Sequence, residues 1–253
     1  MLEPFEFIFW EALKAFGLVV VALLAVKAAR AFARPGGGGR MPGLVLYGVI
    51  LALVALGARA LGQDIAAEVY GWAGQKNLDR HEFATAYSNG LRAVELRPGV
   101  LRYWQLLASA KFDLHQFGSL LRDEPSFRAL SPRGLDEDDL VRFAYARYFV
   151  GEYAQVIPLT AEFIRRNPAY PKSYVLAGLA ETGLRQYAEA ERDFLTALRI
   201  LPTQADAVEG LAHVYFLSGD AGRARAVLEA TSHYAFPPAE RERFKTLMAL
   251  YGQ

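Results

Sequence analysis

The chain of 253 residues contains no cysteine. This absence excludes disulfide bonds, thiolate catalysis and zinc sites with cysteine ligands, but it is compatible with any cellular compartment. The four histidines, His81, His115, His213 and His233, are far apart and lack the spacing of metal ligands. No motif places a nucleophile beside a base. We therefore expect no metal, no cofactor and no catalytic residues, and we expect that the protein is not an enzyme.

A broad basic surface is also lacking, since the formal net charge is only +1. Residues 1–63 hold six Lys and Arg and three Glu, which leaves 28 − 6 = 22 basic and 27 − 3 = 24 acidic residues in 64–253. The larger part of the chain is therefore slightly acidic, and it offers little positive charge for phosphates. We expect no nucleic-acid partner. The acidic run 136–139 is typical of a helix start, where carboxylates cap free amides.

Two long segments near the N-terminus have very few charged residues. Residues 7–26 contain only Glu11 and Lys14, and residues 41–58 contain none. Twenty residues of helix span about 30 Å, the thickness of a bilayer core. Neither segment shows the polar stripe of a helix at the surface of a soluble domain. The sequence thus predicts a transmembrane hairpin over 1–63, with spans at about 7–28 and 41–61.

Two other interpretations of this region were weighed. The segments could be buried helices of a soluble domain, or the first could be a signal peptide cleaved near residues 31–33. Glu3, Glu6 and Glu11 stand where a signal peptide has basic residues, and a second apolar segment follows. The membrane hairpin is the favoured interpretation.

The predicted loop between the spans, residues 29–40, is basic and rich in glycine. Lys27, Arg30, Arg34 and Arg40 favour a cytoplasmic position for this loop, since short basic loops tend to stay on that side. Both termini would then be outside, with residues 64–253 in the periplasm and the hairpin in a bacterial inner membrane. The basic residues at the outer ends, such as Arg59, keep the inverted topology open.

Residues 64–253 show a repeat of about 34 residues. The prolines Pro98, Pro132, Pro168 and Pro202 are spaced 34, 36 and 34 apart. Gly151 recurs at Gly219, two periods later. Small residues follow the same spacing, namely Ala108, Ala144, Gly178 and Ala212. This period indicates an array of helical hairpins, each of which buries its apolar face against its neighbours.

Two segments carry a resemblance to a known family. Trp104, Leu107 and Ala108 match the opening of the tetratricopeptide repeat (TPR) pattern, and Tyr187, Ala190, Phe194, Ala197 and Pro202 match its closing half. The chain thus resembles the TPR family, which implies an all-α solenoid. The predicted units are 67–100, 101–134, 137–170, 171–204 and 205–238, followed by a capping helix at 239–251. Pro125 falls within the second helix of the second unit, so we expect that helix to begin late, bend or be broken.

The resemblance also implies a site. In this family the first helix of each hairpin lines a concave face that binds extended or helical protein segments. Some chaperone-binding members of the family hold a C-terminal carboxylate with basic residues and asparagine. Such a set of residues is not recognisable in this sequence. Plain packing between hairpins is the alternative role for each aromatic candidate. The candidates are Arg102, Gln105, Phe112, Val141, Tyr145, Tyr148, Lys172, Val175, Leu179, Glu209, His213 and Phe216.

These features predict a membrane-anchored TPR scaffold or adaptor that binds protein partners and supports assembly or stability of a membrane or envelope complex. The layout weakly resembles the TPR subunit of bacterial cytochrome c maturation, although the loop here is shorter. A first alternative is a permanent accessory subunit of a larger membrane complex, because Gly17, Gly48 and Gly57 permit close helix contact in lipid. A second is a cytoplasm-facing membrane-tethered receptor or co-chaperone. The sequence does not identify the partner.

Overall fold

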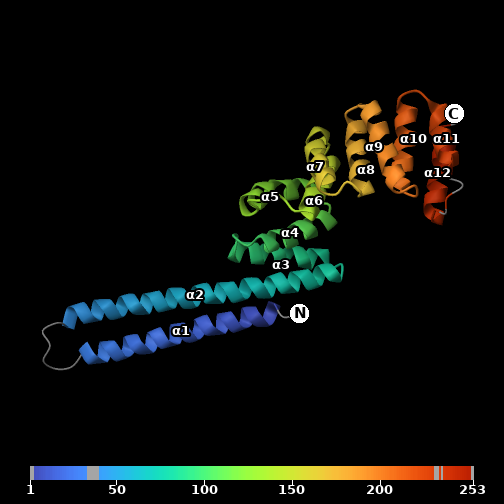
Figure 1. Cartoon of the computed structure of the whole chain (residues 1–253). Helices are drawn as coiled ribbons and strands as arrows, with labels where there is room; N and C mark the ends of the chain where they lie inside the picture. The colour runs from blue at the N-terminus through green and yellow to red at the C-terminus, as the bar shows by residue number, and fades with distance from the viewer. Residues whose placement is uncertain (1–2, 33–39, 231–233, 235, 252–253) are drawn as a thin grey trace. The chain divides into compact units, whose positions relative to one another are not determined.

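The computed structural model describes residues 3–32, 40–230, 234 and 236–251, and every regular element in these ranges is an α-helix (Figure 1). Side chains are described for residues 10–24, 26, 27 and the described residues from 48 onward. The predicted glycine-rich bend at 33–39 lies outside the described residues. The chain forms two compact units, Met1–Ala110 and Lys111–Gln253, which are treated separately below. The predicted all-α class is confirmed for the described part.

The first unit contains a long helical hairpin. Helix α1 (Glu3–Phe32) runs beside α2 (Arg40–Asp79), and the unit continues with α3 (Phe83–Leu96) and most of α4 (Leu101–Asp113) (Figure 1). A Cβ atom at Gly57 would lie 2.8 Å from the side chain of Leu18. The two helices therefore approach closely at this point, and a larger residue at position 57 would require the Leu18 side chain to move.

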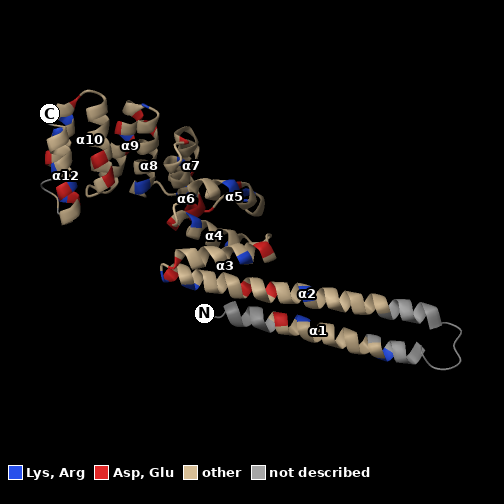
Figure 2. Cartoon of the chain, turned by 180° about the vertical axis from the view of Figure 1, so that it is seen from behind, with Lys and Arg blue, Asp and Glu red and all other residues tan. Residues whose placement is uncertain are grey.

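The hairpin exposes apolar side chains along its length. Phe16 and Leu23 on α1 and Leu53 and Leu56 on α2 are all more than 60% exposed, and charged residues are sparse over the described middle of both helices (Figure 2). Within the described residues one stretch, Gly48–Asp79, is long and apolar enough to cross a membrane, with a mean hydropathy of 1.6 and none of its apolar window buried. A second span, formed by α1, stays a prediction.

Helix α2 does not end where the second predicted span ends. It continues past residue 61 to Asp79, and its last turns pack against α3 as the first helix of a hairpin. The predicted domain boundary at residue 63 falls inside this helix. Cβ atoms at Gly71 and Gly74 would lie 2.7 Å from the side chains of Tyr103 and Leu106, so α4 also approaches α2 closely. One continuous helix thus belongs both to the apolar hairpin and to the first repeat.

Three polar contacts fix the first repeat on α2. The Asp64 carboxylate lies 3.2 Å from Arg97 Nε, at the C-terminal end of α3. The Tyr103 hydroxyl donates a 2.6 Å hydrogen bond to Glu68, and Arg102 pairs with the same carboxylate. Because these contacts begin at Asp64, no flexible linker separates the apolar part of α2 from the repeat.

The second unit is a row of helices that succeed one another as hairpins (Figure 1). Phe194 on α9 is one of its fully buried residues. The ring of Phe194 packs against Gly178 and Gly210, where a Cβ atom would lie 3.0 Å and 2.4 Å from it. The small residues that repeat in the sequence therefore make room for aromatic rings. The helices are α5 (Phe117–Leu130), α6 (Glu137–Phe149), α7 (Tyr153–Arg166), α8 (Pro171–Gly183), α9 (Tyr187–Ile200), α10 (Ala205–Leu217), α11 (Ala221–Ala230) and α12 (Pro238–Leu250).

Each hairpin turn uses the same backbone device. The last turn of the first helix closes with a bond from an N–H to the carbonyl oxygen five residues earlier, for example Gln116 N–H to Lys111 O at 2.8 Å. The residue before that N–H has a positive φ, which is the Schellman arrangement of a helix C-terminus. Glycine fits this conformation, but only two of the five positions hold it. The five residues are His81, His115, Gly151, Arg185 and Gly219.

The predictions of a late start and of a break at Pro125 were wrong, and a bend of the helix stays a prediction. Helix α5 begins at Phe117, as in the other repeats, and runs unbroken through Pro125 to Leu130. Proline removes one backbone donor and crowds the preceding turn. Leu120 and Phe127, both fully buried, hold the helix on either side of the proline, so packing outweighs the local cost.

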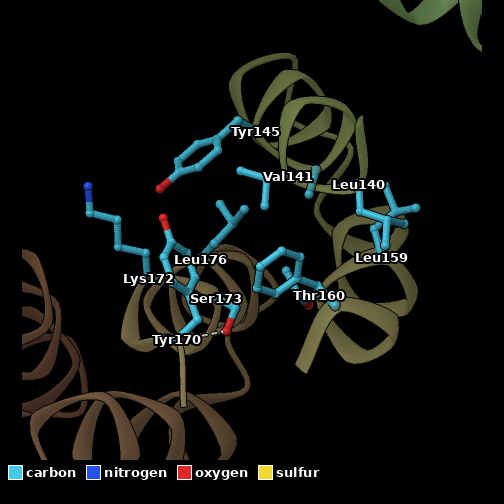
Figure 3. Close-up of a pocket in the computed structure, with 11 residues that line it drawn as sticks. Leu140, Val141, Tyr145, Leu159, Thr160, Tyr170, Lys172, Ser173 and Leu176 are labelled. Carbon is cyan, nitrogen blue, oxygen red and sulfur yellow. Dashed lines mark hydrogen bonds between the residues drawn. The ribbon is translucent and has the colours of Figure 1, made fainter. Parts of the chain in front are cut away.

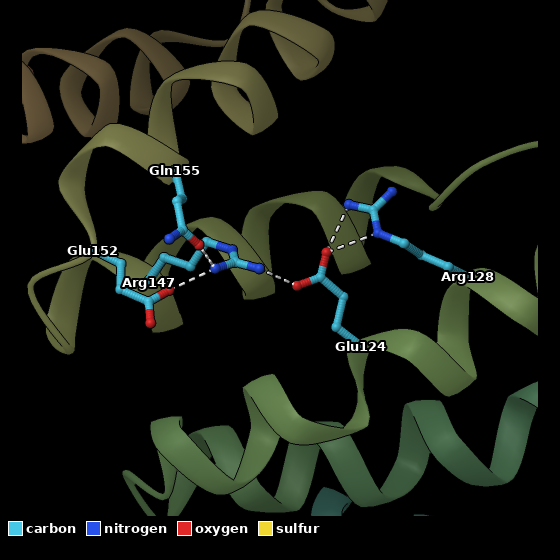
Figure 4. Close-up of polar contacts among 5 residues, drawn as sticks. All are labelled: Glu124, Arg128, Arg147, Glu152 and Gln155. Carbon is cyan, nitrogen blue, oxygen red and sulfur yellow. Dashed lines mark hydrogen bonds and ion pairs between the residues drawn. The ribbon is translucent and has the colours of Figure 1, made fainter.

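A polar network centred on the buried Glu124 joins α5, α6 and α7 (Figure 4). The Glu124 carboxylate on α5 accepts hydrogen bonds of 2.8 and 2.6 Å from Arg128, and it also accepts one from Arg147 on α6. Arg147 in turn pairs with Glu152 at 2.5 Å and donates to Gln155 on α7. Glu124 is only 6% exposed, and the hydrogen bonds from both arginines replace the hydration that its carboxylate loses on burial.

Candidate functional site

A small apolar pocket lies where α6, α7 and α8 meet (Figure 3). Val141 and Tyr145 of α6 and Lys172 of α8, all predicted site residues, share its lining with Tyr170 from the turn before α8. Its cavity volume is about 10 Å³, far below the range of about 300–1,000 Å³ typical of small-molecule sites. As it stands, the pocket has room for about one water molecule. The other lining residues are Leu140, Ala144, Leu159, Thr160, Phe163, Ser173 and Leu176.

The mouth of this pocket is polar. Burial raises the pKa of Tyr145, and the nearby Asp206 and Tyr170 raise it further, so the phenol stays protonated and able to donate. Tyr170 stacks obliquely on Phe163, with ring centroids 5.3 Å apart, which holds its ring at the rim. Lys172 is exposed beside it. The site therefore combines an apolar floor with hydrogen-bond donors at its edge.

Aromatic rings cluster next to the pocket at the turns of two hairpins. Phe112 packs edge-on against Tyr145 at 6.3 Å, and Tyr148 contacts both Phe149 and Tyr153 at 5.6 Å. Burial also raises the pKa of Tyr148. Phe149 is 56% exposed. The structure thus brings the predicted residues Phe112, Tyr145 and Tyr148 into one aromatic surface.

The predicted residues of α8 beyond Lys172 belong largely to the core. Val175 is 3% exposed and forms part of the buried cluster around Phe194. Leu179 is half-buried and packs on the same cluster. Val175 therefore presents almost no surface to a partner. The helical spacing identified its side of the helix but could not predict how closely the next hairpin covers it.

The C-terminal segment around α12 contacts the predicted residues of α10, of which His213 and Phe216 stay exposed and Glu209 is half-buried. The Phe216 ring stacks on Tyr251 with centroids 4.5 Å apart, and His213 Nδ1 lies 3.3 Å from the Tyr251 hydroxyl. Arg243 Nε lies 3.0 Å from Glu209. Burial lowers the pKa of His213. These three candidates are thus occupied by contacts within the chain.

Two of the predicted partner-binding residues lie on α4, in the first unit. Arg102 pairs with Glu68 and lies 5.1 Å from the centre of the Tyr103 ring, so it is held by α2 and by its own helix. Gln105 is half-buried. Partner binding by any of the predicted residues stays a prediction. Of the predicted residues in the second unit, Lys172, His213 and Phe216 are exposed, whereas Val141 and Tyr145 are half-buried.

Sequence reasoning missed the residues that close the pocket. Leu159 and Phe163 come from α7, a second helix, whereas the resemblance pointed only to first helices. Tyr170 lies in the turn between hairpins. Its position directly before Pro171, where the chain must be extended, was the one available signal.

The helical hairpins with a 34-residue period define a TPR-like α-solenoid, and solved structures bear out this class. Residues 41 to the end of MamA from Desulfovibrio magneticus RS-1 match with a TM-score of 0.60 and 17% identity, covering 67% of this chain and 98% of that one. TTC0263, a TPR protein of Thermus thermophilus, matches with a TM-score of 0.54 and 18% identity, covering 72% and 99%. MamA of strain MSR-1 matches with a TM-score of 0.57 and 16% identity, covering 73% of this chain and 97% of that one. No family model matches the chain, and no curated protein matches it.

Proposed function

We propose that the protein is a membrane-anchored scaffold whose TPR-like repeats bind a segment of a partner protein and support assembly or stability of a membrane or envelope complex. The observation that carries this proposal is helix α2. Its exposed apolar stretch, long enough to cross a bilayer, continues without a break into the first repeat. A helix that is apolar and exposed along its length is costly in water and stable in lipid.

The anchoring places the repeats next to the membrane. The contact of Asp64 with Arg97 begins only a few residues beyond the predicted end of the span at 61. At 1.5 Å per residue, the first repeat would start about 5 Å above the hydrocarbon core. A partner bound by this repeat array would therefore be held close to the bilayer, as expected for an assembly factor or a subunit of a membrane complex. The side of the membrane, proposed as periplasmic, follows from the basic loop.

Protein binding is the function best supported by the shape of the second unit. It carries an aromatic surface formed by Phe112, Tyr148 and Phe149, beside the small apolar pocket between α6, α7 and α8. Aromatic residues are enriched where protein interfaces gain most of their free energy. The resemblance to the cytochrome c maturation subunit stays a prediction, because the similar solved structures reported above show the fold alone.

A site-specific photocrosslink tests the proposal. A photoreactive amino acid would replace Lys172, at the pocket mouth, or Arg199, an exposed residue of α9 used as the matched control. In native membranes we expect a discrete crosslinked protein from position 172 and none from position 199. Equal crosslinking from both positions, or recovery of the chain from the soluble fraction, would contradict the proposal.

A second candidate, a permanent subunit of a membrane complex, is favoured by two glycines. A Cβ atom at Gly17 or Gly48 would meet no described atom within 4 Å, so both positions are open to close contact with further membrane helices. Extraction in mild detergent separates the candidates. A permanent subunit co-purifies with other membrane proteins in fixed ratio, and an assembly factor is recovered largely alone.

A further inference from the structure

Helix α2 has a third face besides the two that pack on α1 and on the first repeat. Gly57 lies on the face toward α1, and Gly71 and Gly74 lie on the face toward the repeat. The residues of the third face are spaced alternately four and three apart, and every one is exposed. We call them the α2 seam, and they are Leu51, Ala55, Ala58, Gly62, Ile65, Val69, Trp72 and Lys76.

The spacing of the α2 seam fits a second helix. It averages 3.5 residues, which is the spacing of the positions through which one helix packs along another in a coiled coil. All members before Lys76 are small or apolar. A Cβ atom at Gly62, in the middle of the seam, would meet no described atom within 4 Å. Small residues up to Gly62 let two backbones approach closely, and the larger side chains beyond it add apolar area.

Lipid can cover only the lower half of the α2 seam. With the predicted span ending at residue 61, Trp72 lies 72 − 61 = 11 residues further, or about 16 Å along the helix. The interfacial layer of a bilayer extends only about 5–8 Å beyond the hydrocarbon core. Ile65, Val69 and Trp72 are nevertheless 44%, 57% and 64% exposed. Large apolar side chains on one face of successive turns, beyond the reach of lipid, indicate a surface that a protein covers.

A second copy of α2 meets the requirements of this surface. The covering helix must cross the bilayer and continue beyond it without a break, as α2 does (Figure 1). The nearby carboxylates of Asp64 and Glu68 pair with arginines outside α2, so two parallel seams set no acidic charges against each other. Lys76 ends the seam in water, with its ammonium 4.9 Å from the centre of the Trp72 ring, and two like charges repel only weakly there. The seam is thus compatible with its own copy along its whole length.

We propose that two copies of the chain pair in parallel through the α2 seam. This inference rests on the proposed membrane anchor, because two copies inserted in the same direction must run parallel. Each seam residue then faces its counterpart, with Gly62 against Gly62 and Val69 against Val69. The first repeats of both copies are held together at the membrane, so the scaffold presents every partner-binding surface twice.

Disulfide crosslinking tests the pairing, because the natural chain has no cysteine. Gly62→Cys and Val69→Cys lie on the seam, and the adjacent exposed residues supply the matched controls Gln63→Cys and Tyr70→Cys. In native membranes treated with an oxidant, we expect both seam variants to form a disulfide-linked dimer of twice 28.0 kDa and both controls to stay largely monomeric. Two seam positions are used because antiparallel helices would bring together only residues near one crossing point.

A charge placed in the seam gives a second measurement. Val69→Glu sets two carboxylates face to face and should weaken dimer formation in mild detergent by about tenfold or more. Tyr70→Glu, one residue off the seam, should leave dimer formation unchanged. Native mass spectrometry over a range of protein concentrations measures the dimer fraction. Both positions are exposed, so neither substitution threatens the fold of the single chain.

The other outcomes separate this inference from the scaffold function. Equal crosslinking at seam and control positions, or no self-crosslinking from the seam, would overturn the inference. A crosslinked product that contains a different protein would also overturn it, because a partner helix would then fill the seam. These results leave the scaffold function in place as long as the chain stays in the membrane fraction. Recovery of the chain from the soluble fraction would instead contradict the membrane anchor itself.

Discussion

Glu181 on α8 should make the stability of the repeats depend on pH. Its side chain is 7% exposed, and one carboxylate oxygen has no hydrogen-bond partner. The equivalent residues one repeat before and after are Arg147, which pairs with Glu124, and Tyr215, which donates a 2.7 Å hydrogen bond to Glu191. In α7, the helix that would supply the partner of Glu181, the position equivalent to Glu191 is 191 − 34 = 157, and the position equivalent to Glu124 is 124 + 34 = 158. These positions hold Ile157 and Pro158, whose side chains have no hydrogen-bonding group. Glu181 therefore lacks the partner that the other repeats supply.

Burial raises the pKa of Glu181 from 4.5 to about 7, and Asp193 and Glu189 on α9 add to the rise while Arg192 opposes it. Below about pH 4.5 the group is protonated in both folded and unfolded chains. Between about pH 4.5 and 7 the unfolded chain releases the proton and the folded chain keeps it, so stability falls as pH rises. At about 1.4 kcal/mol per pKa unit, the loss reaches about 3 kcal/mol above pH 7.

Glu181→Gln removes this effect, so the stability of the variant relative to the natural chain should rise by about 3 kcal/mol between about pH 4.5 and 8. Urea unfolding followed by circular dichroism at a series of pH values measures the difference. Glu189→Gln, which removes an exposed carboxylate from α9, is the matched control and should retain most of the natural pH dependence. If the free energy of unfolding changes with pH in the same way for the natural chain and for Glu181→Gln, the reasoning is refuted.

Three further predictions concern the repeats. Gly219 and Arg185 both occupy the left-handed turn position, which favours glycine. Gly219→Ala should therefore destabilise the folded protein by about 1 kcal/mol and lower its thermal midpoint by about 3 °C, whereas Arg185→Gly should raise the midpoint. Equal shifts of the same sign in thermal melts would contradict this prediction. Gly210→Ala should destabilise the folded protein by about 1–3 kcal/mol, because the added methyl group clashes with the Phe194 ring. Phe194→Leu in the same chain should restore part of the lost stability, as measured by urea unfolding. If the stability losses of the two substitutions simply add, the clash is excluded. Arg147→Met should destabilise by about 1–3 kcal/mol by leaving Glu124 with Arg128 alone, and a double-mutant cycle with Glu124→Gln should show coupling between the two sites.

Much of the architecture could be predicted from the sequence because it depends on spacing. Pro168 and Pro202 end hairpins at a fixed period, and Gly178 and Ala190 lie where only small residues fit. The repeated hairpins of the TPR-like fold follow from this pattern. The continuity of α2 was missed because the first repeat lacks a breaker between residues 61 and 79, and an apolar span and an amphipathic repeat helix share one backbone geometry.

The turn and pocket details could not be predicted from a helical pattern. His81, His115 and Arg185 adopt the left-handed conformation without glycine, since a cost of about 1–2 kcal/mol is small beside the packing of a hairpin. Leu159 and Phe163 reach the pocket from second helices, which requires knowing how adjacent hairpins stack. The candidates His213 and Glu209 on α10 contact Tyr251 and Arg243, and these contacts join segments far apart in sequence.

The most direct test of the account is the membrane topology of the repeats. The natural chain has no cysteine, so Ser218→Cys, at an exposed hairpin turn, gives a single reactive thiol. In intact spheroplasts of a bacterial host, a membrane-impermeant thiol reagent should label this position before lysis, with the protein retained in the membrane pellet after alkaline washing. Labelling only after lysis would place the repeats in the cytoplasm, and release of the protein into the wash would contradict the membrane anchor.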